Sequence, residues 1–188
     1  MRAVTQATAF DDASWTPEQA REVTTYFDDR ASDWETRFAA DDSRLAPLDD
    51  ALERGAPITF GRCADVGCGT GIMTARLTSR FEAVVGLDIS RQMLDQGTRA
   101  VSLVLADSAA LPIATASQDV VVLMNAFLFA GEVDRVLAPG GVVVWVSAVG
   151  ADTPIYLSAD DVGAALPGDW GGVWSEAANG TWAVLRRA

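Results

Sequence analysis

Three glycines alternate with other residues in the stretch ADVGCGTG, which follows a short apolar run. They are Gly67, Gly69 and Gly71, and Asp65 precedes them. Glycine lets the backbone take up left-handed conformations and lets a ligand come close to main-chain N–H groups. A helix is expected to begin at Ile72, so its N-terminal N–H groups would point toward the same ligand. The pattern therefore predicts a loop that binds a nucleotide-like ligand.

The spacing of the glycines distinguishes two classes of nucleotide-binding loop. A dinucleotide loop follows G-x-G-x-x-G, which requires glycine where this chain has Ile72. Asp88 ends the next apolar run, where a carboxylate can accept hydrogen bonds from both hydroxyls of a ribose. That carboxylate serves either class of loop. The two motifs together predict an adenosine-containing ligand, and the spacing makes NAD the less favoured choice.

The elements that must hold these residues alternate between strand and helix. From Arg62 onward, short apolar runs such as AVVGLD, DVVVLMN and VVVWVS are separated by helical segments. Strands that are apolar throughout and alternate with helices are typical of a parallel sheet covered on both faces. Near the C-terminus, Asn179-Gly180 between two β-prone runs predicts an antiparallel hairpin. We therefore expect an α/β fold: a Rossmann-like, doubly wound, seven-stranded and mostly parallel sheet with a C-terminal antiparallel hairpin, plus N-terminal helices.

The segment before this core is interpreted as a helical cap. Residues 1–15 show no clear period, so we expect them to be flexible. The sequence TPEQ at residues 16–19 is a helix start, with a capping threonine and a proline at the first helical position. Steps of three and four then predict one helical stripe through Ala20, Val23, Phe27, Ala31, Trp34 and Phe38. A second helix is expected over Ala46–Arg54, ended by Gly55. The chain is thus predicted to be a single domain over 1–188, with a cap at 16–55 and the core at 62–188.

Composition and charge limit the classes of partner. The 188 residues carry a formal net charge of −12, and the pI is about 4.2. An acidic surface repels phosphate backbones, so we expect no nucleic-acid partner. Because the chain has no histidine, Cys63 and Cys68 lack further zinc ligands, and we expect two reduced thiols and no metal. No run is long enough to span a bilayer and the N-terminus lacks an apolar targeting segment, so a cytoplasmic protein without membrane attachment is expected.

Several stretches, in order along the chain, resemble the class I S-adenosylmethionine-dependent methyltransferases. CADVGCGTGIMTARL resembles motif I of that family, and VVGLDISRQML resembles its second-strand acidic motif with the following helix. VLADSAALPIATASQDVVVLMNAF resembles the run from the third strand into the fourth, and EVDRVLAPGGVVVWV the helix and turn before the fifth. YFDDRASDWETRF is similar to an N-terminal segment common in small-molecule members. The resemblance covers about residues 26–186, and the chain is a short form of the family.

The resemblance implies a cofactor, S-adenosylmethionine, and a set of residues that bind it. The glycine loop would line the methionine end, Asp88 would hold the ribose, and Asn125 would lie near the transferred methyl. Asp107 and Ser108 would meet the adenine edge, and Trp34 and Tyr26 would close over the site. The cofactor-binding residues expected in this way are Asp65, Gly67, Cys68, Gly69, Asp88, Ile89, Met93, Asp107, Ser108, Asn125 and Trp34.

The expected reaction is an in-line methyl transfer to a small-molecule acceptor. Positioning is the main requirement, and a base is needed only when the nucleophile begins protonated. Histidine and lysine are absent, so the catalytic candidates are Tyr26, Asn125 and Tyr156, none of them in a motif that marks a catalytic residue. The proline-rich run typical of nucleic-acid amino-methyltransferases does not follow Asn125. The alternative is a protein of the same fold that binds S-adenosylmethionine without methylating. A monomer or a homodimer is expected.

Overall fold

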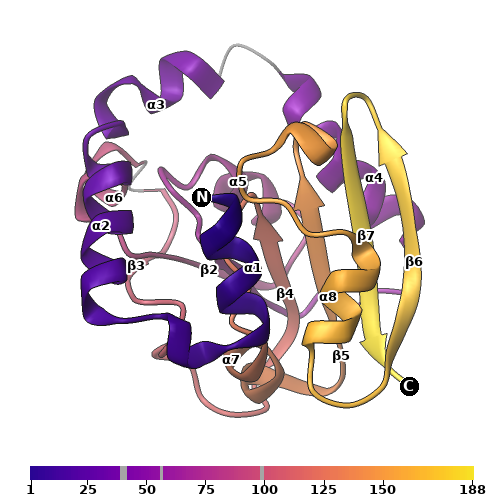
Figure 1. The fold of residues 1–188 in the computed structure, drawn as a ribbon. Coiled ribbons are helices and arrows are strands. Elements are labelled where there is room, and N and C mark those ends of the chain that lie inside the picture. Colours follow the sequence, from indigo (N-terminus) through magenta and orange to yellow (C-terminus); the bar gives the residue numbers. More distant parts are fainter. Residues whose placement is uncertain (39–41, 56, 98–99) are drawn as a thin grey trace.

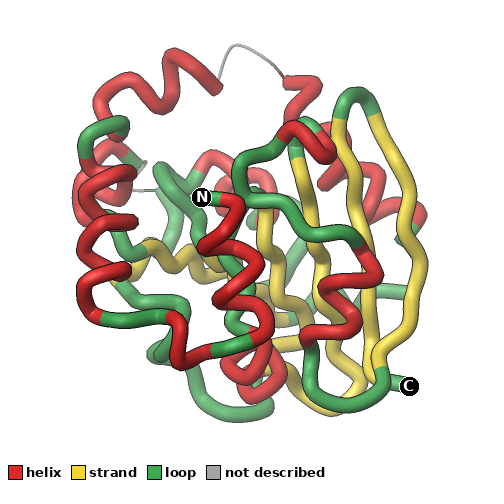
Figure 2. Tube along the Cα trace, viewed as in Figure 1, coloured by secondary structure: helices red, strands yellow, loops and turns green. Residues whose placement is uncertain are grey.

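The run RCADV forms strand β1 (Arg62–Val66), an inner strand of the seven-stranded sheet that the described residues build (Figure 1, Figure 2). The structure is a computed structural model, which describes residues 1–38, 42–55, 57–97 and 100–188. The sheet order is β3-β2-β1-β4-β5-β7-β6, with parallel pairs from β3 to β5 and antiparallel pairs beyond β5. The other strands are β2 (Ala83–Asp88), β3 (Leu103–Leu105), β4 (Gln118–Met124), β5 (Leu137–Ser147), β6 (Trp170–Ala177) and β7 (Gly180–Arg187). The predicted fold class is confirmed.

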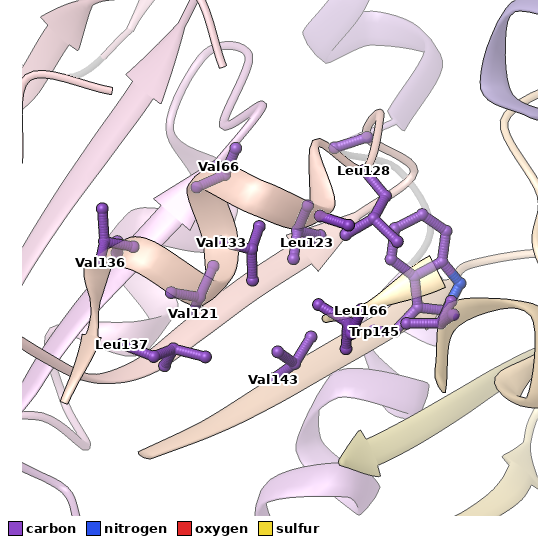
Figure 3. Packing of buried hydrophobic residues seen from close by; sticks show 14 of the residues in the cluster. Val66, Val121, Leu123, Leu128, Val133, Val136, Leu137, Val143, Trp145 and Leu166 are labelled. Carbon is purple, nitrogen blue, oxygen red and sulfur yellow. The ribbon is translucent and has the colours of Figure 1, made fainter. Parts of the chain in front are cut away.

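Side chains that alternate along the strands divide the core between the two faces of the sheet. On one face, Val121 and Leu123 pack in a cluster with Val133 of α7 (Figure 3). The same cluster includes residues of α1 and α8. On the other face, Val120 and Val122 belong to a cluster that includes residues of α4 and α5. The helices of the core and its cover are α4 (Ala46–Arg54), α5 (Ile72–Leu77), α6 (Arg91–Gln96), α7 (Ala130–Val136) and α8 (Ala159–Ala165). Because both faces are covered, the central strands are apolar throughout.

The N-terminal segment forms a regular helix, so the expectation of a flexible stretch over 1–15 is wrong for most of it. Helix α1 spans Arg2–Phe10, and a 3₁₀ turn follows at Asp12–Ser14. Thr5 and Thr8 are fully buried, and each hydroxyl donates to a backbone carbonyl of the preceding turn. Buried threonines satisfied in this way belong to the packed face of the helix. A pattern that counts only apolar residues does not register them.

The predicted stripe from Ala20 to Phe38 is divided into two helices. Helix α2 spans Pro17–Asp28 and begins as predicted, with the Thr16 side chain accepting from the N–H of Gln19. Helix α3 spans Ala31–Phe38. Between them, the Arg30 guanidinium donates to the carbonyl of Tyr26 at 2.7 Å and so satisfies an acceptor of the last turn of α2. The Asp28 carboxylate at the same end of α2 accepts from Ser90 and Gln92 at the start of α6, which fixes α2 beside the end of β2.

The C-terminal hairpin turns one residue earlier than Asn179-Gly180 predicts. Ala177 pairs with Gly180, so the two turn residues are Ala178 and Asn179, with φ of +50° at Ala178. Gly180 already belongs to β7, where a Cβ would lie 2.6 Å from the carbonyl oxygen of Ser147. The glycine is therefore needed for close packing against the end of β5 and not for the turn.

Candidate functional site

A cavity of about 460 Å³ lies at the carboxyl ends of β1, β2 and β4, where the strand order reverses between β1 and β4. Open parallel sheets bind their ligands at such a reversal. The N-terminal helices supply the opposite wall. The lining includes Trp15, Val23, Tyr26, Phe27, Arg30, Trp34, Glu35, Arg44, Gly67, Cys68, Gly69, Thr70, Asp88, Ile89, Met93, Asp107, Ser108, Asn125, Phe127, Phe129, Thr153 and Ile155.

The glycine loop has the left-handed backbone that its composition predicts. Gly67, Gly69 and Gly71 have φ of 74°, 57° and 79°. A Cβ at Gly67 would lie 2.6 Å from the Cβ of Ala126, so glycine is required there for packing as well as for backbone conformation. A Cβ at Gly69 would lie 3.6 Å from the indole nitrogen of Trp34. Trp34 of the N-terminal cap therefore lies next to the glycine loop.

Asp88 is held at the edge of the cavity by the loop itself. Its carboxylate accepts from the N–H of Gly69 and from the N–H of Ser90, both at 2.8 Å. Burial raises the pKa of the Asp88 carboxyl, and the hydrogen bonds from Ser90 and Gly69 act in the opposite direction. A carboxylate offers about four lone-pair positions, so two protein donors leave acceptor capacity for a ligand.

Asp65 does not line the cavity, in contrast to the expectation that it would contact the ligand. It is fully buried beneath the loop, and its Oδ2 accepts from the Thr74 hydroxyl at 2.6 Å. The pKa of the Asp65 carboxyl is raised to about 7. Burial is the main cause, the nearby charge of Asp88 adds to the rise, and the Thr74 hydrogen bond opposes it. Oδ1 of Asp65 has no hydrogen-bond partner among the described residues.

Asn125 lies at the end of β4 in a left-handed conformation, with φ of 52°. Its N–H donates to the carbonyl of Val146, and its side-chain Oδ1 accepts from the N–H of Ala148, each at 3.0 Å. Both bonds fix the residue to the end of β5. Non-glycine residues in this region of conformational space are uncommon and are often found at functional sites.

Tyr156 lies outside the cavity, so the structure does not support it as a catalytic candidate. The lining ends with Thr153, Pro154 and Ile155, and the Tyr156 ring instead lies 5.7 Å from the Arg2 guanidinium. Tyr26 does line the cavity, with the Arg30 guanidinium 3.6 Å from its ring centroid. The cavity is also lined by Cys68, Ile89, Met93, Asp107 and Ser108, which the sequence predicts as cofactor-binding residues.

Trp15 is a lining residue that the sequence analysis did not single out. Its indole nitrogen donates to both carboxylate oxygens of Asp107, at 3.1 and 3.0 Å. A lone tryptophan before a helix start carries no motif, so only the folded chain could show this contact. Thr70, within the glycine loop, was also missed; its hydroxyl is buried without a hydrogen-bond partner among the described residues.

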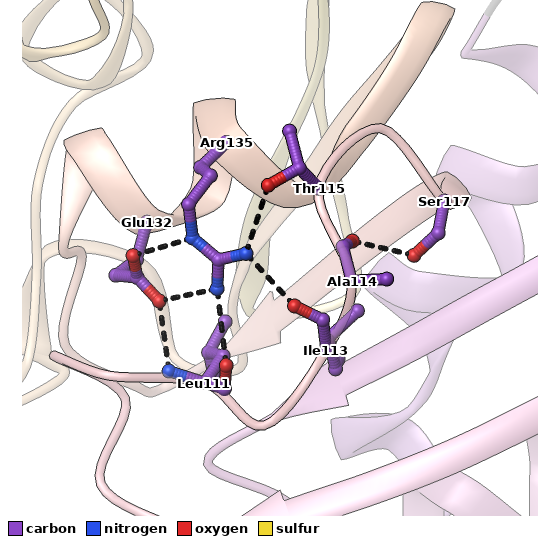
Figure 4. A network of polar contacts seen from close by, with 7 residues as sticks. All are labelled: Leu111, Ile113, Ala114, Thr115, Ser117, Glu132 and Arg135. Atoms are coloured by element: carbon purple, nitrogen blue, oxygen red, sulfur yellow. Dashed lines mark hydrogen bonds and ion pairs between the residues drawn. The ribbon is translucent and has the colours of Figure 1, made fainter.

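An ion pair on α7 holds the loop that carries Asp107. Arg135 and Glu132 on α7 form a two-bonded pair, with N–O distances of 2.7 Å (Figure 4). Arg135 also donates to the carbonyls of Leu111 and Ile113, and Glu132 accepts from the N–H of Leu111 (Figure 4). The Arg135 guanidinium keeps the pKa of the Glu132 carboxyl below its usual value. The segment between β3 and β4 is therefore held at Leu111 and Ile113, a few residues after Asp107, which lines the cavity.

Comparison with known proteins identifies this arrangement. Residues 64–145, which contain the glycine loop, Asp88, Asp107 and Asn125, match the family described as "Methyltransferase domain". These residues form a domain of the class I S-adenosylmethionine-dependent methyltransferases. The predicted resemblance is confirmed, and S-adenosylmethionine is the cofactor of this family.

Two curated relatives match about half of the chain. The biotin biosynthesis bifunctional protein BioHC of Cellvibrio japonicus is 35% identical over 107 residues, which is 51% of this chain and 21% of that protein. The malonyl-[acyl-carrier protein] O-methyltransferase of Methylovorus is 36% identical over 116 residues, 50% of this chain and 39% of that protein. The chain thus spans well under half the length of either relative.

A solved structure extends the likeness of the fold beyond the matched domain. The DhpI-SAM-HEP complex is 19% identical, covers 92% of this chain and 99% of that one, and gives a TM-score of 0.72. At this identity the likeness concerns the fold alone.

The residues of the cavity fit the methyltransferase cofactor. Asp88 has acceptor capacity for ribose hydroxyls, and Thr70 has a buried hydroxyl without a hydrogen-bond partner among the described residues. Gly67 and Gly69 line the cavity without side chains that would fill it. In the described part of the chain there is no group of three or more His, Cys, Asp or Glu side chains that could hold a metal ion. No helix among the described residues is both long and apolar enough to cross a membrane.

Proposed function

We propose that this protein transfers a methyl group from S-adenosylmethionine to a small-molecule acceptor. One observation carries the proposal: the same cavity contains the glycine loop with Asp88 and, beyond Asn125, an apolar wall of Phe127 and Phe129. A cofactor at the loop would leave its methyl group facing the part of the cavity bounded by that wall. Binding both reactants in one enclosure supplies the positioning on which methyl transfer from a sulfonium depends.

We propose the following roles for the residues of the site. Asp88 binds the ribose hydroxyls, and the backbone of the glycine loop with Thr70 binds the methionine end. Asp107 meets the adenine edge, and Ile89 and Met93 pack against the purine. Asn125 orients the groups beside the transferred methyl, and its strained backbone is held by β5. Trp34 closes the site from α3. Cys68 fills space in the loop, and its burial keeps its pKa above the usual value, so it remains a thiol.

We propose further that the acceptor brings its own ionised nucleophile, a carboxylate. Such an acceptor needs no protein base, which agrees with a chain that contains neither histidine nor lysine. Two arginines, Arg30 and Arg44, line the cavity of a protein whose net charge is −12. Guanidinium groups bind carboxylates through paired hydrogen bonds. The relative from Methylovorus is named as an O-methyltransferase for a malonyl group, which presents a free carboxylate.

Turnover with labelled cofactor tests the proposal. The protein is incubated with methyl-labelled S-adenosylmethionine and matched pairs of carboxylic acids and their amides. We expect S-adenosylhomocysteine and a labelled methyl ester to form in equal amounts from an acid and not from its amide. Transfer to amines alone would contradict the carboxylate assignment. Tight binding of S-adenosylhomocysteine without transfer to any acceptor would favour a binding protein that does not methylate.

Arg30→Gln and Arg21→Gln separate the effect of an arginine that lines the cavity from the effect of surface charge in general. Arg30→Gln should raise KM for the acid acceptor by about tenfold, the size of a charge-assisted hydrogen bond. Its Kd for S-adenosylhomocysteine should stay unchanged; a higher Kd would mean that Arg30 binds the carboxylate of the cofactor instead. Arg21→Gln on the exposed side of α2 is the matched control and should change neither constant.

Tyr26→Phe should lower the rate of methyl transfer only modestly if no base is needed.

A further inference from the structure

The side chain of Trp15, in the N-terminal segment that covers the cavity, forms a hydrogen bond with Asp107 at the end of the sheet. Trp15 comes just before α2, and its side chain reaches Asp107, which follows β3 at the far side of the site. The indole N–H is shared between both oxygens of that carboxylate, at 3.1 and 3.0 Å. The N–H of Ala109 donates to Oδ1 of Asp107 at 2.9 Å. Two N–H groups from separate segments of the chain therefore hold the Asp107 carboxylate.

The bonds leave the carboxylate able to accept from a ligand. An ionised carboxylate has about four lone-pair positions and no donor, so two N–H groups do not saturate it. A carboxylate held by two protein donors meets a ligand donor without having to reorient first. Asp107 itself lines the cavity, where it can select a ligand that presents an amino group.

The ring of Trp15 is held by aromatic side chains of the acceptor wall. Its centroid lies 5.9 Å from that of Phe127 and 5.2 Å from that of Phe129, the latter edge-on. Both phenylalanines are buried and follow Asn125. Edge-to-face contacts of this kind fix the plane of a ring. The contacts with Phe127 and Phe129 thus fix the plane of the indole ring, and its N–H points toward Asp107.

We propose that Trp15 determines the selectivity of this site for adenine, acting as a positioning residue that orients Asp107 toward the exocyclic amino group of the purine. The proposal rests on the proposed function in one respect, that the adenine of the cofactor lies against Asp107. Trp15 then takes part in recognising the adenine ring, and this recognition depends on the N-terminal segment of the chain.

Binding of two ligands to Trp15→Phe tests the assignment. The ligands are S-adenosylhomocysteine and its 6-deamino analogue, in which a hydrogen atom replaces the amino group. Phenylalanine keeps the aromatic contacts and removes the N–H. We expect the Kd for S-adenosylhomocysteine to rise about tenfold, in keeping with a bond to a charged group. The Kd for the deamino analogue should change by less than about twofold, since that ligand makes no bond to the oriented carboxylate.

Two further variants make the result decisive. Trp170→Phe is the matched control, because that indole N–H donates to the carbonyl of Pro167 at 3.0 Å and Trp170 does not line the cavity; it should leave both constants unchanged. Asp107→Asn should reduce the preference for the amino group, and adding Trp15→Phe to it should reduce the preference no further. Equal weakening of both ligands by Trp15→Phe, or no weakening, would overturn the inference. Failure of the unaltered protein to bind S-adenosylhomocysteine would instead count against the proposed function.

Discussion

Gly67 combines a left-handed backbone with a close neighbour, and the two effects can be separated by experiment. Gly140 also has a positive φ, of 81°, but a Cβ there would meet no atom within 4 Å. Gly140→Ala should therefore lower the unfolding free energy only through the strain of a left-handed backbone, by about 1–2 kcal/mol. Gly67→Ala should cost about 2–4 kcal/mol, because its Cβ would also meet Ala126. It should weaken cofactor binding as well. Chemical denaturation of both variants checks this, and equal losses would mean that contact with Ala126 is unimportant.

Asp65 should make the stability of the ligand-free protein depend on pH in an unusual direction. The pKa of its carboxyl is about 7 in the folded protein, against 3.8 for the ordinary value. Between these values the folded state keeps a proton that the unfolded chain has lost, so unfolding releases a proton. Stability then falls as pH rises from about 4 to about 7, by about 4 kcal/mol for this group, and the loss stays constant at higher pH.

Asp65→Asn removes that dependence and keeps an acceptor for the Thr74 hydroxyl. The variant should gain stability relative to the unaltered protein as pH rises from 5 to 8. Denaturant midpoints at several pH values measure the difference. Parallel curves for the two proteins would show that Asp65 is ionised in the folded state well below neutral pH.

At the scale of elements, α7 holds the loop that presents Asp107. Arg135 makes paired bonds to Glu132 and reaches two loop carbonyls, at 2.8 and 3.0 Å. Arg135→Lys keeps the charge but cannot make this set of bonds, so we expect a loss of about 1–3 kcal/mol and faster amide exchange in residues 106–117. Arg80→Lys alters an exposed pair with Glu53 and should cost less than about 0.5 kcal/mol. Unchanged exchange in the loop would show that α7 does not hold it.

At the scale of the whole molecule, the cofactor would join the sheet to the N-terminal helices. A ligand that binds only the folded state at a hundred times its Kd adds about 2.7 kcal/mol. For a chain of this size that corresponds to a rise in Tm of roughly 5–10 °C. S-adenosylhomocysteine should produce this shift in a thermal melt, and NAD should produce none. A shift with NAD in place of S-adenosylhomocysteine would refute the cofactor assignment.

The sheet and the glycine loop could be predicted from the sequence because both depend on neighbours in the chain. Apolar runs such as that of β4 make buried strands whatever they pack against, and glycines at alternate positions permit the left-handed turn. For the same reason the helix start at Thr16 was predicted correctly. The division of α2 from α3 was not, because Arg30 and the contact of Asp28 with Ser90 decide it.

The sequence by itself therefore determined the fold class, the family and the order of the motifs around the cofactor loop. The tertiary structure decided which of the candidate side chains share a cavity. It placed Tyr156 beside Arg2 and outside the cavity, and it buried Asp65 beneath the loop. It brought Trp15 to Asp107, two residues that are far apart in the sequence. Local patterns report what each residue does to its own backbone, whereas a contact between distant segments exists only once the sheet has placed their ends together.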